Sequence, residues 1–261
     1  MRAEEYLLDL QSRGRYTFTT TEALVKIRGS DIAVRRALLR LKKKGILVTP
    51  FRGFHIVIPP EYCSLGCLPP DQWVPDLMGY LGEPYYAGLL TAAEYHGAAH
   101  QRPQAFQVVT PRARPPIRCG RGRVQFIMRS NTSAVPTVDV NSVRGLLRVS
   151  TPEATALDLI AYPHQAGGID NVATVIAELA ERLDPQRLLE TSALVAELPA
   201  VQRLGYILDY VGARGAADPL RDYIAGVAKT PVPLAPSEPV SGLPVDGGWR
   251  VVVNAHLDPD L

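Results

Sequence analysis

Residues 30–44 alternate apolar and basic positions with the period of an α-helix. At about 100° per residue, four apolar side chains share one face: Val34, Ala37, Leu38 and Leu41. The basic side chains lie elsewhere, with Arg36, Arg40 and Lys43 opposite this face and Arg35 at its edge. Ser30 is a favourable N-cap, and Gly45 is suited to end the helix. The pattern predicts a capped helix that packs through one face and exposes a basic one.

Patterns before this helix predict two further helices. Residues 3–11 place three large apolar residues on one side, as in a helix packed on a small core. Residues 20–27 begin with threonines suited to capping, and Arg28 and Gly29 then form a tight turn. The resulting order of helix, turn and basic helix is typical of a helix-turn-helix motif.

The residues after the basic helix predict a β-hairpin. β-Branched and aromatic residues occupy 46–48 and 54–58, and Arg52 lies in the loop between them. A hairpin in this position is the wing of a winged helix-turn-helix, whose second helix enters the major groove while the first crosses the DNA backbone. We therefore expect residues 1–60 to form a winged helix-turn-helix DNA-binding domain.

The charge distribution supports a nucleic-acid partner for this first domain. Residues 1–58 hold 12 Lys and Arg against 5 Asp and Glu, whereas the rest of the chain holds 16 against 21. A basic domain joined to an acidic remainder is expected when only the first part meets phosphates. For the helix alone, a solvated basic face without a partner is the alternative. The expected DNA contacts are Thr20, Arg28, Ser30, Arg35, Arg36, Arg40, Lys43 and Arg52.

The 261-residue chain is long enough for a second domain with its own core. We expect a mixed α/β domain over residues 61–261, with a sheet-containing part at 76–165 and a mainly helical part at 166–261. A proline-rich segment at 59–75 is predicted to be a linker that packs locally. The expected fold class is α+β: a winged helix-turn-helix followed by a larger mixed α/β domain with a helical C-terminal part.

Local periodicity predicts the elements of the second domain. Strand patterns occupy residues 105–110, 123–128 and 146–149. Helical patterns occupy residues 85–97, a segment opened by Thr151 and Pro152, and residues 170–183, 185–197, 200–211 and 219–228. A last strand at 249–254 is expected to rejoin the sheet.

A basic loop is predicted between two of these strands, at residues 111–123. Prolines and glycines exclude a helix there, and the segment carries five arginines: Arg112, Arg114, Arg118, Arg121 and Arg123. Such a loop is either a solvated hairpin tip or a second basic surface that contacts a polyanion or a protein partner. The sequence leaves both interpretations open.

Cysteine use and the absence of leader or membrane patterns indicate a cytoplasmic protein. Three cysteines are an odd number in a chain of this size, which argues against a disulfide framework and fits a reducing compartment. No run of about 18 apolar residues is present. Residues 1–5 are too acidic to begin a secretory signal.

A zinc site is one interpretation of two spaced pairs, Cys63 with Cys67 and His96 with His100. Gly97 weakens the helix that would align the two histidines. Buried thiols, and a histidine that caps a helix end, are the more common arrangement. We therefore expect no metal and no cofactor.

The motifs of common enzyme classes are missing from the sequence. It has no G-x-S-x-G elbow, no H-E-x-x-H, no P-loop and no G-x-G-x-x-G after a strand. We therefore expect no enzyme activity. One function that stays open is that of a one-component winged-helix regulator whose C-terminal domain senses a small ligand, which titration calorimetry against effectors would reveal.

Several segments together resemble the AbiEi-type antitoxins of type IV toxin–antitoxin systems. They are the winged N-terminus with Arg52-Gly53-Phe54, GLLTAAEYHGAAHQRPQ at 88–104, STPEATALDLIAYPHQAGGIDNVA at 150–173, QRLGYILDYVG at 202–212 and WRVVVN at 249–254. Their order and spacing extend over nearly the whole chain. The resemblance implies an N-terminal domain that represses the antitoxin–toxin operon at inverted repeats in double-stranded DNA. It also implies a C-terminal domain that neutralises a nucleotidyltransferase-like toxin, directly or indirectly.

Overall fold

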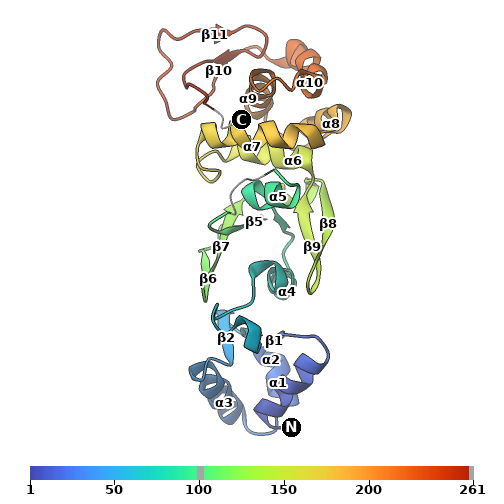
Figure 1. Ribbon diagram of the computed structural model, residues 1–261, viewed down its shortest axis with the longest axis vertical. Helices are drawn as coiled ribbons and strands as arrows, with labels where there is room; N and C mark the ends of the chain where they lie inside the picture. The colour runs from blue at the N-terminus through green and yellow to red at the C-terminus, as the bar shows by residue number, and fades with distance from the viewer. Residues whose placement is uncertain (99–102, 259–261) are drawn as a thin grey trace. The chain divides into compact units, whose positions relative to one another are not determined.

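Two compact units, each built from three segments of the chain, make up the computed structural model (Figure 1), which describes residues 1–98 and 103–258. Unit 1 comprises Met1–Tyr85, Gln104–Ser130 and Asp139–Arg148. Unit 2 comprises Tyr86–Pro103, Asn131–Val138 and Val149–Leu261. The fold is mixed, with helices and several small sheets, in agreement with the α and β content expected. The first segment of unit 1 continues to Tyr85, beyond the domain boundary expected at residue 60. Whether residues 1–60 fold independently stays a prediction.

The first residues of unit 1 form three helices and a three-stranded antiparallel sheet. The helices are α1 (Ala3–Ser12), α2 (Thr20–Lys26) and α3 (Asp31–Lys43), and the strands are β1 (Thr17–Thr19), β2 (Leu47–Phe51) and β3 (Phe54–Val57). The strand order is β1-β3-β2. Strand β1 was not predicted, because three residues are too few to establish an alternating pattern. One apolar core joins these elements: Tyr6, Leu7, Leu10, Phe18, Ala23, Ile27, Val34, Leu38, Leu41, Leu47 and Val57.

The segment expected to be a linker contains structure of its own. Two 3₁₀ turns, Pro60–Tyr62 and Pro70–Gln72, lead into helix α4 (Val74–Leu81), which ends at Gly82 in the left-handed conformation. The segment was expected to pack locally, as it does, but its helical turns were not predicted. The prolines stand at the first turns of these helices, where a missing N–H is tolerated. Trp73, Val74, Leu77 and Met78 are buried in a second core that also includes Phe54 and Ile56 of β3.

A second sheet segment of unit 1 contains β5 (Phe106–Thr110), β6 (Ile117–Cys119) and β7 (Gly122–Met128). Strand β5 pairs in parallel with β7, and β6 pairs antiparallel with β7. Strand β6 lies inside the segment that was expected to be a loop, so the arginine-rich residues form a short hairpin instead. The arginines hide the strand pattern in the sequence, since only Ile117 and Cys119 alternate with them.

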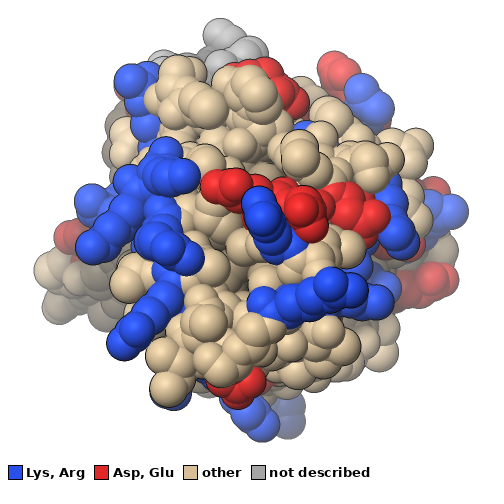
Figure 2. Space-filling model, turned by 90° about the horizontal axis from the view of Figure 1, so that it is seen from below, with Lys and Arg blue, Asp and Glu red and all other residues tan. Residues whose placement is uncertain are grey.

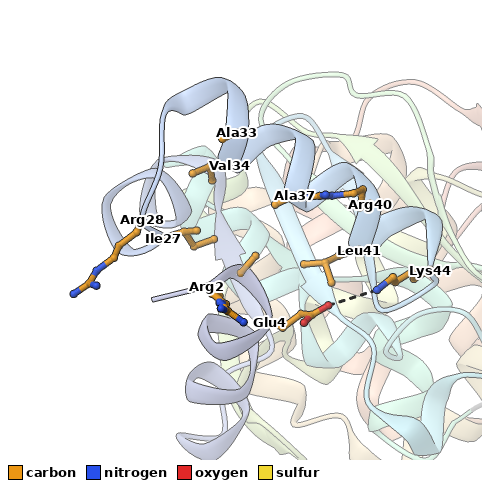
Figure 3. Close-up of a pocket in the computed structure, with 11 residues that line it drawn as sticks. Arg2, Glu4, Ile27, Arg28, Ala33, Val34, Ala37, Arg40, Leu41 and Lys44 are labelled. Atoms are coloured by element: carbon orange, nitrogen blue, oxygen red, sulfur yellow. Dashed lines mark hydrogen bonds and ion pairs between the residues drawn. The ribbon is translucent and has the colours of Figure 1, made fainter.

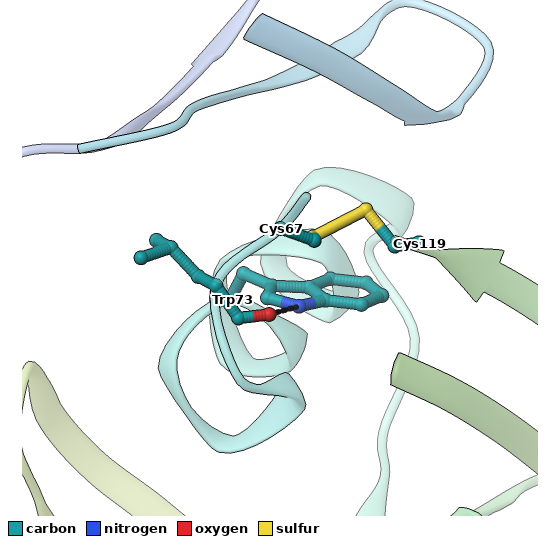
Figure 4. The surroundings of a disulfide bond; sticks show 4 residues. Cys67, Trp73 and Cys119 are labelled. Atoms are coloured by element: carbon teal, nitrogen blue, oxygen red, sulfur yellow. Dashed lines mark hydrogen bonds between the residues drawn. A yellow bond between two sulfur atoms is a disulfide. The ribbon is translucent and has the colours of Figure 1, made fainter. Parts of the chain in front are cut away.

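A disulfide joins Cys67 to Cys119 in the second core of unit 1 (Figure 4), with 5.6 Å between the two Cα atoms. The expectation that the cysteines are free thiols was therefore wrong for this pair. An odd count leaves room for one pair, and here Cys63 is the exposed free cysteine. The Trp73 indole belongs to the same core and donates its Nε1 hydrogen to the Leu68 carbonyl at 3.1 Å.

Unit 2 is mainly helical. Its helices are α5 (Leu89–Tyr95), α6 (Pro152–Ala161), α7 (Ile169–Leu179), α8 (Pro185–Val195), α9 (Leu198–Tyr210) and α10 (Arg214–Val227). Helix α6 is buried along almost its whole length and packs against α5, α7, α8 and α9. Short strand β4 (Tyr86–Ala87) pairs in parallel with β9 (Gly145–Ser150) through Ala87 and Val149. Strand β8 (Thr137–Ser142) neighbours β9 in the sheet and was not predicted, and most residues of both strands belong to unit 1.

Two predictions for the end of the chain were wrong. Helix α10 begins at Arg214, so Pro219 lies inside it rather than at its start. The last strand does not rejoin the larger sheet, because β10 (Val232–Pro233), β12 (Val251–Val252) and β11 (Val245–Asp246) form a three-stranded sheet of their own. Gln202 of α9 holds this sheet by donating to the carbonyls of Trp249 and Arg250 at 3.2 and 3.1 Å. In the described ranges, no helix is long and apolar enough to cross a membrane.

Candidate nucleic-acid interface

Helix α3 presents the basic face that its sequence predicts. Ser30 caps the helix by accepting a hydrogen bond from the Ala33 amide at 3.3 Å, so its hydroxyl is already engaged. Val34, Leu38 and Leu41 are buried, whereas Ala37 is only half-buried. The basic side chains are exposed: Arg35, Arg36, Arg40, Lys42 and Lys43. The helix therefore packs on one side and offers five cations to solvent on the others.

Two apolar side chains share the exposed face of α3. Ile32 is 65% exposed and Leu39 is 53% exposed. At about 100° per residue both lie on the same side of the direction of Arg36, about 40° and 60° from it. This feature was not singled out from the sequence, although the same periodicity that predicts the buried face places these two residues on the opposite one. The outward surface is thus mixed, with apolar groups beside guanidinium groups.

A buried imidazole connects α2 to the wing, the hairpin of β2 and β3. His55 of β3 lies within 2.8 Å of the Thr20 hydroxyl through Nε2, and within 3.0 Å of the Thr49 hydroxyl through Nδ1. Burial, together with the nearby charge of Lys42, lowers the pKa of His55 to about 4. The ring is therefore neutral near pH 7. The bond to Nε2 positions the hydroxyl of Thr20, one of the expected DNA contacts.

The same residues border a pocket of about 240 Å³ beside α3. Arg35, Leu39 and Lys42 of α3 line it from one side, and Thr20, Thr49 and His55 line it from the other. The pocket therefore combines the charges of Arg35 and Lys42 with two threonine hydroxyl groups that are hydrogen-bonded to the neutral imidazole. Charge and hydroxyl donors in this combination suit a phosphate oxygen.

The tip of the wing is fastened by α4. The Tyr80 hydroxyl donates to the Arg52 carbonyl at 3.3 Å, and the Tyr80 ring packs against Phe54 with 5.8 Å between ring centroids. Gly53 has a φ of +80°, and a Cβ there would lie 2.6 Å from the Tyr80 oxygen. The Thr20 amide also donates to the Gly53 carbonyl at 2.8 Å. The Arg52 side chain itself remains exposed at a tip whose backbone is fixed.

A shallow pocket of about 410 Å³ lies on the other flank of α3 (Figure 3), between that helix, the start of α1 and the end of α2. Ile27, Val34 and Leu41 supply its apolar lining. Four cations surround it: Arg2, Arg28, Arg40 and Lys44. Glu4 and Lys44 point toward one another and pair at 3.5 Å, while Arg28 points away from the pocket. Arg28 and Arg40 thus lie on a different flank of α3 from Arg35.

The face that carries α1, α2 and α3 groups its charges (Figure 2). Lys and Arg side chains gather in separate groups on this face, and a band of Asp and Glu side chains lies between two of them. The acidic side chains of α1 are Glu4, Glu5 and Asp9, of which Asp9 pairs with Arg13 at 2.9 Å. The positive surface of unit 1 is therefore divided into patches and is not one continuous field.

The five arginines predicted as a single basic surface fall into two sets. Arg114 pairs with Glu83 at 2.7 Å, and Arg112 pairs with the other oxygen of the same carboxylate at 3.4 Å. Arg114 is largely covered and Arg112 is exposed. The second set consists of the exposed side chains of Arg118, Arg121 and Arg123 on the β6–β7 hairpin. Within the parts of the chain that the structure describes, none of these three forms an ion pair.

The residues of the possible zinc site are not brought together as a cluster. Cys67 is in the disulfide, and Cys63 is exposed. His96 binds the Ser150 carbonyl through Nε2 at 2.7 Å, and His100 lies outside the described residues. Over residues 1–98 and 103–258, no group of three or more His, Cys, Asp or Glu is arranged to hold a metal ion.

Comparisons with known proteins give a family match for the middle of the chain. The family described as the AbiEi antitoxin C-terminal domain matches residues 86–210. A search of curated proteins gave no significant match. Among solved structures, the crystal structure of the RV2827C protein from Mycobacterium tuberculosis is similar, with a TM-score of 0.69 and 18% sequence identity. The alignment covers 96% of this chain and 90% of that chain, so the likeness concerns the fold over nearly the whole length.

Proposed function

Residues 86–210 belong to the AbiEi antitoxin family, and on that premise we propose that this protein is the antitoxin of a type IV toxin–antitoxin system. It neutralises a nucleotidyltransferase-like toxin, directly or indirectly, and represses its own operon by binding double-stranded DNA at inverted repeats. It acts in the cytoplasm and carries out no catalysis itself. The family match supports the antitoxin activity, and the basic face of α3 supports the DNA-binding activity.

For DNA binding, we assign α2 and α3 to a helix-turn-helix and the β2–β3 hairpin to its wing. The observation that carries this assignment is the exposed face of α3, where cations project from a helix whose opposite face is buried in a core. Arg35, Arg36 and Arg40 face the major groove. Phosphates are held by Thr20 beside the His55 pocket, by Lys43 at the end of α3 and by Arg52 at the wing tip. Ser30 at the N-cap of α3 and Arg28 in the turn before it are assigned as further DNA contacts.

Mobility shifts on DNA from the upstream region of the gene test this assignment. Arg36→Gln should lose about 1 to 3 kcal/mol of discrimination between that DNA and a random duplex, because an arginine that reads guanine makes a bidentate contact. Arg52→Gln should weaken both duplexes alike and lower the salt slope by about one. Arg187→Gln, an exposed arginine on α8, is the control of equal charge change. If neither Arg36→Gln nor Arg52→Gln differs from that control, the DNA-binding assignment is wrong.

Co-expression with the toxin tests neutralisation independently of DNA. The full chain should restore growth, and Arg36→Gln should restore it equally while failing to repress, since neutralisation is assigned to the C-terminal domain, residues 61–261, which does not include α3. The matching measurement is survival counts beside a reporter fused to the operon's promoter. Loss of rescue in a folded Arg36→Gln protein would assign the two activities to the same surface and contradict the proposal.

A further inference from the structure

We propose that the β6–β7 hairpin is a second phosphate-binding surface, which contacts the backbone of the same DNA duplex whose bases α3 reads. This inference rests on the proposed DNA-binding function and extends it. The surface consists of Arg118, Arg121 and Arg123, and its ligand is the sugar–phosphate backbone that flanks the sequence read by α3. The contact is independent of base sequence.

The inner side of the hairpin is built onto the wing. Ile117 and Cys119 are buried in the core that contains Phe54 and Ile56 of β3, and Val48 and Phe51 of β2 pack against that core. Strand β6 itself packs against β2. The hairpin and the wing are therefore parts of one compact unit, and a duplex held against the wing would have the hairpin at its side.

The outer side of the hairpin gathers positive charge without a carboxylate. Arg118 and Arg123 are direct cross-strand partners, so their side chains project to the same side, and Arg121 lies in the turn between them. Like charges in directly opposite positions destabilise a strand pair. Glu83 balances Arg112 and Arg114, but among the described residues no acid balances these three. An anionic partner relieves the repulsion, and DNA phosphate is the anion already required beside this unit.

The hairpin is held rigidly enough to act as a docking surface. The Arg121 amide donates to the Leu65 carbonyl at 2.9 Å, and the disulfide fixes Cys119 to Cys67. Gly120 has a φ of +56°, and a Cβ there would lie 2.0 Å from the Leu65 oxygen, so the turn is packed without space. A rigid backbone lowers the entropy lost when its side chains bind.

The test is the salt dependence of binding to a random-sequence duplex of about 30 base pairs, measured by fluorescence anisotropy between about 50 and 200 mM salt. Arg118→Gln/Arg121→Gln/Arg123→Gln should lower the slope of log affinity against log salt by about 0.9 for each lost phosphate contact, up to about three in total. The matched control is Arg182→Gln/Arg187→Gln/Arg214→Gln, which removes the same charge from exposed sites in unit 2. If the triple variant does not fold, Arg121→Gln alone replaces it in this test, because it changes only a residue of the turn.

The outcomes separate this inference from the proposed function. Suppose that the hairpin variant has the same salt slope as the control, while Arg36→Gln loses operator discrimination. This result overturns the second phosphate-binding surface on the hairpin and supports DNA reading by α3. If none of these variants, including Arg52→Gln, changes binding, the proposed DNA-binding function as a whole is wrong. A folded hairpin variant that binds DNA as the parent does but no longer rescues cells from the toxin overturns the inference as well, and places a protein partner on the hairpin.

Discussion

At the scale of residues, His55 should control how the stability of unit 1 depends on pH. Its pKa of about 4 lies below the usual 6.5, so the unfolded chain takes up a proton that the folded one resists. This contribution is complete above about pH 6.5 and is lost as the pH falls toward 4, by at most about 1.4 kcal/mol per pH unit. Urea unfolding from pH 7.5 to 4.5 measures it.

Two variants make the assignment to His55 specific. His55→Gln should be less stable at pH 7, because one ring connects Thr20 and Thr49, but its stability should fall less between pH 6.5 and 4.5. His164→Gln, at an exposed site, should keep the parent's pH dependence. An unchanged pH dependence in His55→Gln would show that other groups cause the loss.

The exposed apolar residues of α3 should contribute to sequence recognition through thymine methyl groups. Ile32 and Leu39 are about 10 Å apart along a helix that rises 1.5 Å per residue, which corresponds to roughly three base-pair steps in total, with Arg36 between them along the axis. An apolar contact with a methyl group is worth about 0.8 kcal/mol, or roughly fourfold in affinity. Operator DNA with uracil in place of thymine should therefore bind the parent more weakly.

A double-mutant comparison distinguishes methyl contacts from general packing. Ile32→Ala and Leu39→Ala should each lose affinity for thymine DNA and respond less than the parent to uracil substitution. Val25→Ala, exposed on α2, should respond as the parent does. If uracil weakens the parent and both α3 variants equally, these side chains do not contact methyl groups.

Features of single residues could be predicted where the interacting residues are close together in the sequence. The basic and apolar faces of α3 follow from local periodicity alone, and its Ser30 cap was read correctly. The partners of His55 lie 35 and 6 residues away, and Tyr80 binds a carbonyl 28 residues away. No local pattern relates such residues, so the pocket and the fastened wing tip could not be predicted. The DNA contacts themselves stay predictions.

At the scale of elements, the disulfide should determine how firmly β6 is attached. Closing a loop of this length stabilises the folded state by about 2–4 kcal/mol, mainly by restricting the unfolded chain. Cys67→Ser/Cys119→Ser should therefore unfold at lower denaturant concentration than the oxidised parent. The parent in reductant should approach the double variant, and Cys63→Ser should match the parent in both conditions. Insensitivity of the parent to reductant would show that the bond does not contribute.

Elements with clear ends were predicted, and short or interrupted ones were not. Helix α3 and helix α6 have caps and a regular period, so their bounds are close to those expected. Helix α4 was missed because prolines obscure its start, and β6 because arginines occupy its exposed positions. Strand β12 was expected in the larger sheet, since a β-branched run does not specify which strand it pairs with.

At the scale of the whole molecule, truncation of the chain after residue 60 should leave one face of β3 buried and expose the other. Val57 lies in the core formed by residues 6–57, which the fragment 1–60 retains, so that fragment should fold. Phe54 and Ile56 lose their cover from Trp73 and Leu77, so the fragment should self-associate. Sedimentation of fragment 1–60 measures this.

Ile56→Thr provides the decisive comparison for this cut. In the fragment it should reduce self-association, because it removes an exposed apolar group. In the full chain it should destabilise by about 2 kcal/mol or more, because the hydroxyl is buried without a known partner. If Ile56→Thr leaves the self-association of the fragment or the stability of the full chain unchanged, β3 is not shared between the two cores.

The interleaved segments of unit 1 also have a consequence for synthesis on the ribosome. Met1–Tyr85 emerges first, but Gln104–Ser130 and Asp139–Arg148 are needed to complete the unit. The last of these segments emerges roughly 60 residues after the first, a delay of several seconds at about 5–20 residues per second. During that interval the nascent chain exposes Phe54, Ile56 and the Trp73 segment without their partners from β6 and β7. A pause in translation between residues 85 and 117 should therefore increase capture by chaperones or proteases, and the cellular level of the protein should depend on elongation rate.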